Sequence, residues 1–161
     1  MEVNNFAEIA AEFSARVRKV VWCNMATVDP LGRPRSRVLH PIWEGVIGWI
    51  GTSVGSYKGH HLRQNPYVSL AYIADITRPV YVDCLAEWIE DPAQRQYVWD
   101  LFEHTPEPIG YDPAPFFGTL ETFGVLKLTP WRIDLVSFPA PSLQEGSQIW
   151  HNPEVTAPVP A

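Results

Sequence analysis

Apolar residues near the start of the chain recur at three- and four-residue intervals. The residues that share this spacing are Phe6, Ile9, Ala10, Phe13 and Val17. Residues spaced in this way lie on one face of a helix, because an α-helix turns once every 3.6 residues. Asn4 and Asn5 precede them and are of a type that caps helix N-termini. We therefore predict an amphipathic helix over residues 5–18.

After residue 18 the pattern changes to short runs of apolar and β-branched residues, separated by turn residues. Runs of this kind predict strands. The expected strands are residues 20–28, 34–43, 46–52, 67–74, 79–89 and 123–138. Asp29–Gly32 and Glu44–Gly45 have the composition of tight turns between neighbouring strands. Pro130 lies inside the last run, which is therefore either one long strand or two strands that meet at a bend.

Two further helices interrupt the strands. The first begins at Ser56 and ends at about Gln64, because Asn65-Pro66 follows it. The second begins after Asp91, a capping residue followed by proline, and runs to about His104. Its expected inward-facing residues are Tyr97, Val98, Leu101 and Phe102.

Six strands with short turns and few helices are typical of a mainly β fold, an antiparallel barrel or sandwich with peripheral helices. The chain has 161 residues, which is enough for one domain with its own core. We assign residues 1–140 to this domain, including a long proline-containing loop over residues 105–118. Residues 141–161 are expected to form an extended, proline-rich tail.

Composition excludes several classes of function. The chain has 12 Lys and Arg against 18 Asp and Glu, a net charge of -6 and a pI of about 5.3. It lacks the broad basic face that nucleic acids require, and no run approaches the ~20 apolar residues that span a bilayer. The N-terminal residues do not have the pattern of a signal peptide. Cys23 and Cys84 are expected to be free, buried thiols in a reducing compartment, which predicts a cytoplasmic protein.

Positive charge is concentrated in residues 29–66. The basic residues of this span are Arg33, Arg35, Arg37, Lys58 and Arg63. The three arginines of the expected strand alternate, so their side chains share one face and repel one another unless solvent or an anion lies between them. The alternative is a solvated edge strand whose charges prevent aggregation. Arg37 is followed by apolar Val38 and Leu39, and it is the arginine that we expect to enter a pocket.

The helix start at residue 56 is a second feature that suits an anion. Thr52 ends a strand, Gly55 permits a sharp turn, and Ser56 begins a helix whose first N–H groups are free to bind an anion. Lys58 adds a positive charge in the first turn. The alternative is a Ser-capped surface helix with a solvated lysine. Combined with the arginines, this helix start predicts a phosphate site.

Two stretches of sequence carry a resemblance to a known family. They are ATVDPLGRPRSRVL at residues 26–39 and WIGTSVGSYKGHHLRQNPYVSLAY at residues 49–72. The first places an Arg and apolar residues after G-x-P. The second places G-S-x-K, a short helix and N-P-x-V-S-L after a strand that ends in Thr. The order of these motifs resembles that of the pyridoxamine 5'-phosphate oxidase-like family. The resemblance implies an antiparallel split β-barrel that binds FMN.

The resemblance also implies which residues hold the flavin phosphate. Arg37 and Lys58 would supply the charge, and Ser56 and Thr52 would add hydroxyl contacts. Tyr57 stands where the family often has an arginine, so one phosphate contact of the family is missing here.

His61 or Arg63 would compensate for that missing charge. The resemblance further implies that the main chain at Val38 and Leu39 runs beside the isoalloxazine ring. Gly51 would lie where the cofactor approaches its strand.

Members of the family are typically homodimers with cofactors at the subunit interface, so a partner would complete each site. Trp131 and Arg132 are candidates for that contribution, although a core Trp and an exposed Arg are the alternative. Phe116 and Phe117 either cover the flavin, shape a substrate pocket or seal the end of the barrel. Pyridoxamine phosphate oxidases end in Arg-Leu-x-Pro, whereas this sequence ends in PEVTAPVPA, so vitamin B6 oxidation is not expected.

The predicted function is an FMN-dependent oxidoreductase that acts on an unidentified small molecule. No protein acid or base is assigned to catalysis, because the flavin carries the chemistry. No metal site is expected, because no Cys or His has zinc-ligand spacing. One alternative is a reductase that binds a deazaflavin, with Arg33, Arg35 and Arg63 along its longer anionic tail. The others are a flavin-binding protein without turnover and an interaction module without a cofactor.

Overall fold

The computed structural model describes residues 1–138 and 146–155, and for residues 57–60 it describes the backbone only. The strands are β1 (Glu2–Val3), β2 (Cys23–Val28), β3 (Pro34–Leu39), β4 (Pro41–Glu44), β5 (Ile47–Ser53), β6 (Tyr67–Tyr72), β7 (Val80–Trp88), β8 (Phe123–Leu135) and β9 (Gln148–His151). The helices are η1 (Phe6–Glu8), α1 (Ala10–Val17), α2 (Tyr57–Gln64), α3 (Pro92–His104) and α4 (Ala114–Phe117). Among the described residues, no helix is long and apolar enough to cross a membrane.

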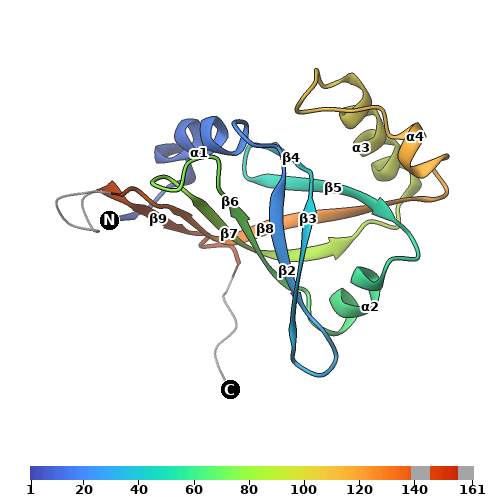
Figure 1. Cartoon of the computed structure of the whole chain (residues 1–161), viewed down its shortest axis with the longest axis horizontal. Coiled ribbons are helices and arrows are strands. Elements are labelled where there is room, and N and C mark those ends of the chain that lie inside the picture. The colour runs from blue at the N-terminus through green and yellow to red at the C-terminus, as the bar shows by residue number, and fades with distance from the viewer. Residues whose placement is uncertain (139–145, 156–161) are drawn as a thin grey trace.

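All of these strands belong to one sheet, so the expected mainly β fold with peripheral helices is confirmed (Figure 1). The strand order is β1-β9-β8-β7-β6-β2-β3, with β5 paired to β8 and β4 paired to β5. The pairs are antiparallel except for the parallel pair β1–β9. Figure 1 shows α1 near the N-terminus and β9, whereas α2, α3 and α4 lie toward the opposite end.

The sheet divides along β8. Residues 123–128 of β8 pair with β5, residues 132–135 pair with β9, and β7 pairs with β8 on its other edge. Pro130 lies between the two halves, and the register of the β7–β8 pair shifts there. Proline has no N–H for a ladder, so the change of partner falls where the ladder is already interrupted. Residues 123–138 therefore resolve into a single strand, Phe123–Leu135.

The chain crosses between two parts of the sheet at His40. The expected single strand over residues 34–43 is wrong, because β3 pairs with β2 whereas β4 pairs with β5. Pro41 begins β4, and its missing N–H prevents the β3 ladder from continuing. The barrel is therefore joined between β3 and β4 by the covalent chain and not by a ladder. We call this junction the seam.

Two groups of buried side chains hold these elements together. The first fills the barrel beneath α1 and includes Phe13, Met25, Ile50, Leu70 and Leu128. The second lies between α3 and the strands β4, β5 and β8 and includes Ile42, Val98, Phe102, Phe123 and Val125. Burial of apolar surface drives both contacts. The second group fixes α3, and the loop that follows it, against the seam.

Most helix boundaries follow the expected capping residues. Asp91 caps the first turn of α3 by accepting a backbone N–H with its side chain. Val98 and Phe102 are buried as expected, but the prediction for Tyr97 is wrong, because its side chain is 50% exposed. The helix expected over residues 5–18 is divided into η1 and α1, with Ile9 between them.

The segment expected to be a C-terminal tail contributes a strand to the sheet. β9 pairs with β8 and β1, and Trp150 of β9 is buried against Phe6, with ring centroids 5.3 Å apart. Aromatic burial draws this strand into the core, although the neighbouring prolines favour an extended, separate segment. Of the expected tail, residues 141–145 and 156–161 lie outside the described residues.

Candidate functional site

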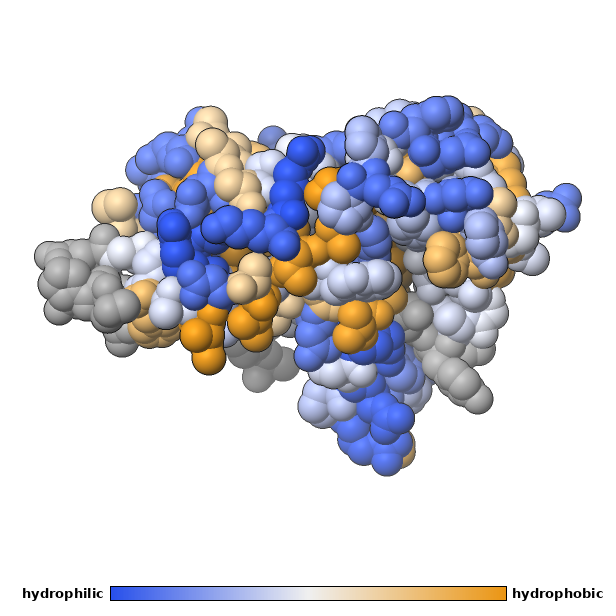
Figure 2. Space-filling view, turned by 45° about the horizontal axis from the view of Figure 1, so that its top comes forward, coloured by the Kyte–Doolittle hydropathy of each residue, from blue (hydrophilic) through white to orange (hydrophobic). Residues whose placement is uncertain are grey.

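Figure 1 shows α2, α3 and α4 toward one end of the molecule. Two pockets are lined by residues of the start of α2, of the segment after α3 and of the neighbouring strands. The first, which we call the polar pocket, has a volume of about 580 Å³. Its lining residues are Asp29, Pro30, Arg33, Arg35, Arg37, Ser56 and His61. They come from the β2–β3 hairpin and the start of α2. Figure 2 shows this hairpin as a projection covered mainly by hydrophilic residues.

One of the three arginines in the polar pocket is already neutralised. The Nε atom of Arg33 lies 2.8 Å from Oδ2 of Asp29, and the backbone N–H groups of Arg33 and Leu31 donate to Oδ1 of the same carboxylate. The backbone N–H of Arg33, followed by its guanidinium, lowers the pKa of Asp29. Arg33 therefore stabilises the turn between β2 and β3, and its charge is paired with Asp29.

Arg37 is held by a polar side chain from the neighbouring strand. Its Nη1 donates to Oγ1 of Thr27 at 2.9 Å, and the same oxygen lies 3.2 Å from Nδ1 of His61. Thr27 is 1% exposed and faces the barrel interior from β2. Because the buried hydroxyl of Thr27 contacts both His61 of α2 and Arg37 of β3, it fixes the position of α2 relative to β3. The arrangement presents Arg37 and His61 to the same pocket.

Two guanidinium groups in the polar pocket carry charge that the described residues do not compensate. Neither Arg35 nor Arg37 forms an ion pair with a described carboxylate. Partial burial, followed by repulsion from Arg35, lowers the pKa of Arg37. The Arg37 cation is therefore less favourable here than in water, and a bound anion would remove that cost. The pocket is electrostatically suited to a phosphate.

Ser56 supplies an independent sign of a missing partner. It is the residue before the first turn of α2, but its side chain makes no capping hydrogen bond. Its Oγ is buried and has no hydrogen-bond partner among the described residues. Buried hydroxyls rarely lack a partner, because an unmade hydrogen bond costs free energy. An anion in the polar pocket would provide the acceptor for this hydroxyl and for the free N–H groups of α2.

The second pocket, which we call the apolar pocket, has a volume of about 450 Å³. Its lining residues are Val21, Trp22, Val38, Leu39, His40, Gly51, Glu107, Pro108, Gly110, Tyr111, Phe116 and Phe117. Arg37 and Leu39 share one face of β3 and line the polar and the apolar pocket respectively, so the two pockets lie along the same face of this strand. An anionic group in one and a flat apolar group in the other could belong to a single ligand.

His40, at the seam, is a polar residue within the apolar pocket. Its Nε2 lies 2.8 Å from the backbone oxygen of Ile109, which as an acceptor requires the proton on Nε2. Burial lowers the pKa of His40, so the neutral imidazole is favoured at neutral pH. Its ring packs against Trp22 and Tyr111, with centroids 5.0 and 5.1 Å away. His40 is therefore part of an uncharged aromatic wall.

Gly51 lines the apolar pocket, and packing alone gives a reason for glycine there. A Cβ at residue 51 would lie 2.5 Å from Cε2 of Phe123 and 3.1 Å from Oη of Tyr111. No side chain larger than hydrogen fits without moving these rings. Close packing of β5 under the second core group thus requires this glycine, in addition to any requirement from a cofactor.

The structure brings together most of the expected cofactor residues. Arg37, Ser56 and His61 line the polar pocket, whereas Val38, Leu39 and Gly51 line the apolar pocket. Thr52 is buried in β5 and lines neither. The side chains of Tyr57 and Lys58 lie outside the described residues, although both belong to the first turn of α2. Arg63 is exposed and does not line the polar pocket, so His61 is the better placed of the two candidates to compensate for Tyr57.

Trp131 lies apart from both pockets. It lines a hollow of about 200 Å³ on the outer face of β2, together with Val28, Tyr67 and Asp83. Its Nε1 is buried without a hydrogen-bond partner among the described residues. Arg132, the neighbouring candidate, forms an ion pair with Asp134 at 2.8 Å. Within one chain, neither residue reaches the candidate cofactor site.

Four residues of the site were not predicted from the sequence. Thr27 and Asp29 could have been identified from the pattern along the chain, because they continue the inward-facing positions of β2, Cys23 and Met25, into the turn before the arginines. His40 and Tyr111 could not, because their contact joins residues far apart in the chain.

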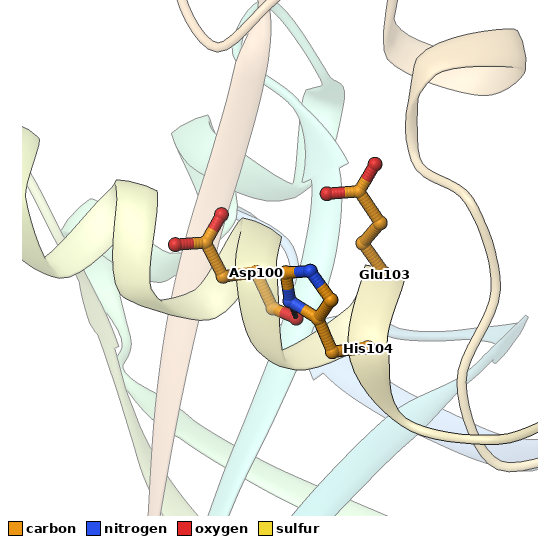
Figure 3. A group of neighbouring side chains, drawn as sticks. All are labelled: Asp100, Glu103 and His104. Atoms are coloured by element: carbon orange, nitrogen blue, oxygen red, sulfur yellow. Dashed lines mark hydrogen bonds between the residues drawn. The ribbon is translucent and has the colours of Figure 1, made fainter.

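A cluster of two carboxylates and one histidine lies on α3 and lines neither of these pockets. Figure 3 shows Asp100, Glu103 and His104 on successive turns, with the imidazole between the two carboxylates. Their potential ligand atoms lie within 4.8 Å of one another. Nδ1 of His104 is already within 2.9 Å of the backbone oxygen of Asp100. Exposed groups of this kind are common on helices, and they add nothing to the site at the seam.

A model of the pyridoxamine 5'-phosphate oxidase family matches residues 9–136 of this chain. The match includes both pockets and all strands from β2 to β8. The chain belongs to the pyridoxamine 5'-phosphate oxidase family. No curated protein sequence matches it.

Solved structures of the pyridoxamine 5'-phosphate oxidase fold resemble this chain at low identity. A Clostridium acetobutylicum protein related to general stress protein 26 has a TM-score of 0.71 at 12% identity, over 91% of this chain and 96% of its own. An FMN-binding protein of Nostoc punctiforme has a TM-score of 0.62 at 16% identity, over 86% and 87%. An F420 reductase has a TM-score of 0.55 at 18% identity, over 74% and 94%. These similarities confirm the split-barrel fold.

The side chains of the two pockets fit FMN. The ribityl phosphate needs donors and positive charge, and Arg37, Arg35 and the unpartnered Oγ of Ser56 offer both. The isoalloxazine ring needs a flat apolar surface, which Val38 and Leu39 provide in the adjoining pocket.

Proposed function

We propose that this protein is an FMN-dependent oxidoreductase that acts on a small molecule. The phosphate of FMN would bind in the polar pocket, and its isoalloxazine ring would lie in the apolar pocket against β3 and β5. The observation that carries the proposal is the polar pocket itself. It combines uncompensated charge on Arg37 with a buried hydroxyl of Ser56 that has no partner among the described residues. Solvation alone does not explain a buried, unpaired hydroxyl at a helix start.

When bound, the flavin would supply the transfer of hydride or electrons. The chain would bind and orient it and would exclude water from the ring. Arg37, fixed by Thr27, and Ser56 would set the position of the phosphate. The aromatic residues of the apolar pocket would keep the reacting face dry, which strengthens electrostatic interactions there.

The proposal is tested by comparing FMN with riboflavin, which has the same ring and no phosphate. Arg37→Gln should weaken FMN binding at least about tenfold, because a hydrogen bond to a charged group contributes about 1.5–3 kcal/mol before solvent screening reduces it. Riboflavin affinity should be unchanged by the same substitution. Binding is measured by quenching of flavin fluorescence on titration with protein.

Arg18→Gln is the matched control, because Arg18 is an exposed arginine outside both pockets. It should leave both affinities within about twofold of the unsubstituted protein. An equal loss of FMN and riboflavin affinity in Arg37→Gln would show that the substitution disturbs the fold and not a phosphate contact. Absence of FMN binding by the unsubstituted protein would refute the proposed function.

A deazaflavin coenzyme is the second candidate. Arg35 lines the polar pocket, is exposed, and has no ion-pair partner among the described residues, so charge remains available beyond one phosphate. A coenzyme with a longer anionic tail would use it, and one similar structure is an F420 reductase. Arg35→Gln should then weaken deazaflavin binding more than FMN binding. The two coenzymes also differ in their absorption spectra, so the spectrum of the purified protein distinguishes them.

We also infer a homodimer. Its support is the apolar hollow around Trp131 on the outer face of the sheet and the 65% exposure of Val38, which borders the apolar pocket. A second copy that covers these surfaces would bury them and would complete the cofactor site. Sedimentation equilibrium should therefore give a dimer, and Trp131→Ala should shift it toward monomer. A monomer with undiminished FMN affinity would refute this inference.

A further inference from the structure

A short chain of hydrogen bonds joins β3, β2 and α2 beside the polar pocket. Its members are Arg37, Thr27 and His61. The hydroxyl of Thr27 lies in the middle, 2.9 Å from Nη1 of Arg37 and 3.2 Å from Nδ1 of His61. Because Thr27 is 1% exposed, its hydroxyl depends on these two side chains and not on water.

The guanidinium group sets the direction of these hydrogen bonds. Arg37 is a donor only, so the oxygen of Thr27 accepts from it. The one proton of the hydroxyl then needs an acceptor, and Nδ1 of His61 is the acceptor that the described residues provide. An imidazole nitrogen that accepts carries no proton, so the proton of the neutral His61 ring lies on Nε2.

Nε2 of His61 is therefore a hydrogen-bond donor. The two nitrogens lie on different edges of the imidazole, so Nε2 is turned away from Thr27 when Nδ1 faces it. His61 is half-buried and lines the polar pocket, and its Nε2 has no partner in the described part of the chain. Its N–H is available to a ligand in that pocket.

Other donors that line the polar pocket also lack an acceptor. Oγ of Ser56 is buried without a partner among the described residues. Arg37 uses only Nη1 in hydrogen bonds within the described protein, which leaves its remaining N–H groups free. Asp29 also lines the pocket, but its carboxylate already accepts from the Arg33 side chain and from two backbone N–H groups. Donors from β3 and α2 thus converge on a space that suits a phosphate.

We propose that His61 binds the phosphate of FMN through its Nε2–H, and that Thr27 is the positioning residue that keeps this nitrogen the donor. Thr27 donates to Nδ1 of His61 and accepts from Arg37, so it aligns both phosphate-binding side chains. The inference rests on the proposed function, since the phosphate belongs to the flavin. Because the imidazole is neutral, His61 replaces a hydrogen bond of the arginine that the family often has at residue 57, and not its charge.

The test begins with the hydroxyl of Thr27. Binding of FMN, riboflavin and inorganic phosphate is measured by calorimetry at about pH 8, where an unperturbed imidazole is neutral. Thr27→Val removes the hydroxyl and should weaken FMN and phosphate binding about tenfold, because both Arg37 and His61 lose their hydrogen bond. Riboflavin, which has no phosphate, should bind Thr27→Val as it binds the unsubstituted protein. Thr27→Ser restores the hydroxyl and should restore FMN and phosphate binding.

Substitutions of His61 test which nitrogen is the donor. The side-chain amide nitrogen of glutamine can take the place of Nε2, so His61→Gln should bind FMN within about threefold of the unsubstituted protein. Asparagine is too short to reach that place, and leucine has no donor. His61→Asn and His61→Leu should therefore weaken FMN binding about three- to tenfold, the effect of one hydrogen bond.

A double-substitution cycle tests whether Thr27 acts through His61. In the His61→Leu background, Thr27→Val should weaken FMN binding less than it does in the unsubstituted protein, by a factor of at least about three. The effect that remains is the one on Arg37. Thr119→Val, at an exposed threonine that lines neither pocket, is the matched control and should leave the three affinities unchanged.

Three results would overturn this inference and leave the proposed function intact. Undiminished FMN affinity in His61→Leu would show that the imidazole does not contact the phosphate. An equal loss in His61→Gln and His61→Leu would show that Nε2 is not the donor. Effects of Thr27→Val and His61→Leu that simply multiply would show that Thr27 does not act through His61.

Failure of the proposed function has a different signature. FMN binding by the unsubstituted protein is measured first, and its absence would refute the flavin and not the phosphate contact. Inorganic phosphate is then the probe for the same set of variants. Phosphate affinity that is lost in Thr27→Val and restored in Thr27→Ser would support the contact, and equal affinity in both would overturn it.

Discussion

The polar and apolar pockets both lie along β3, at Arg37 and at Leu39, yet they are built in different ways. The polar pocket takes all its described lining residues from positions 29–61, and most belong to one hairpin. The apolar pocket joins residues from positions 21–51 with residues from positions 107–117. Local strand pairing can position the first, whereas only the packing of α3 against the seam can position the second. The two should therefore respond differently to substitutions in the core.

Phe102→Ala should have the largest effect and should separate the two pockets. Phe102 is fully buried and packs against Tyr111, so removing its ring should destabilise the protein by about 3–5 kcal/mol. The segment after α3 should lose its position, and riboflavin binding should fall more than tenfold. Urea unfolding measures the first effect, and calorimetry on the folded variant measures the second.

Inorganic phosphate should bind Phe102→Ala as it binds the unsubstituted protein, because no residue of the polar pocket contacts this ring. Phe138→Ala, at an exposed phenylalanine, should change stability by no more than about 0.5 kcal/mol. If phosphate binding is lost together with riboflavin binding, the pockets are not independent and the comparison fails.

Gly51→Ala should have an intermediate effect, and it sharpens the comparison at the barrel wall. The added methyl group would lie 2.5 Å from the ring of Phe123, and overpacking of this kind costs about 1–3 kcal/mol. Gly55→Ala, near the start of α2, is the matched control, because a Cβ there would meet no atom within 4 Å. Chemical unfolding of the two variants side by side checks the difference. Equal stabilities would mean that the rings around Gly51 move aside easily.

The smallest expected effect is a pH dependence of the free energy of unfolding, which should come from His40 in the apolar pocket. Burial lowers the pKa of His40 in the folded protein, whereas in the unfolded chain it stays near 6.5. The unfolded state then binds the proton more strongly, so the stability from neutral His40 is complete above about pH 6.5 and is lost as the pH falls toward the folded-state pKa.

His40→Gln tests this dependence, because glutamine can still donate to the carbonyl of Ile109 but does not titrate. Between pH 7.5 and pH 5.5, the unsubstituted protein should lose more unfolding free energy than His40→Gln. Urea titrations at both pH values measure this difference. Identical losses in the two proteins would exclude His40 as the source.

The residues of the polar pocket were more predictable than those of the apolar pocket. The alternation of Arg33, Arg35 and Arg37 indicated a shared face, and the Ser56 helix start indicated an anion site. Both features arise within a few residues, where strand and helix periodicity are dependable. The ion pair that removes Arg33 from the site was not visible, although Asp29 is only four residues away. Whether a charge is paired depends on side-chain geometry and not on spacing alone.

Errors in the expected elements fell where tertiary contacts override local preference. Residues 34–43 were predicted as one strand, but they form two strands that meet at His40, because each pairs with a different neighbour. Residues 148–151 lie in a proline-rich segment and still form β9, because Trp150 gains more from burial than the segment loses by ordering.

The sequence by itself determined the mainly β character of this protein, its helix starts and the concentration of positive charge near Arg37. These depend on periodicity and capping, which act over one turn or one hairpin. Only the tertiary structure decided that Tyr111 lies across from Gly51 and that the imidazole of His40 lies between aromatic rings at the seam. Contacts between residues so far apart are set by how buried surfaces fit together, and no local pattern records that fit.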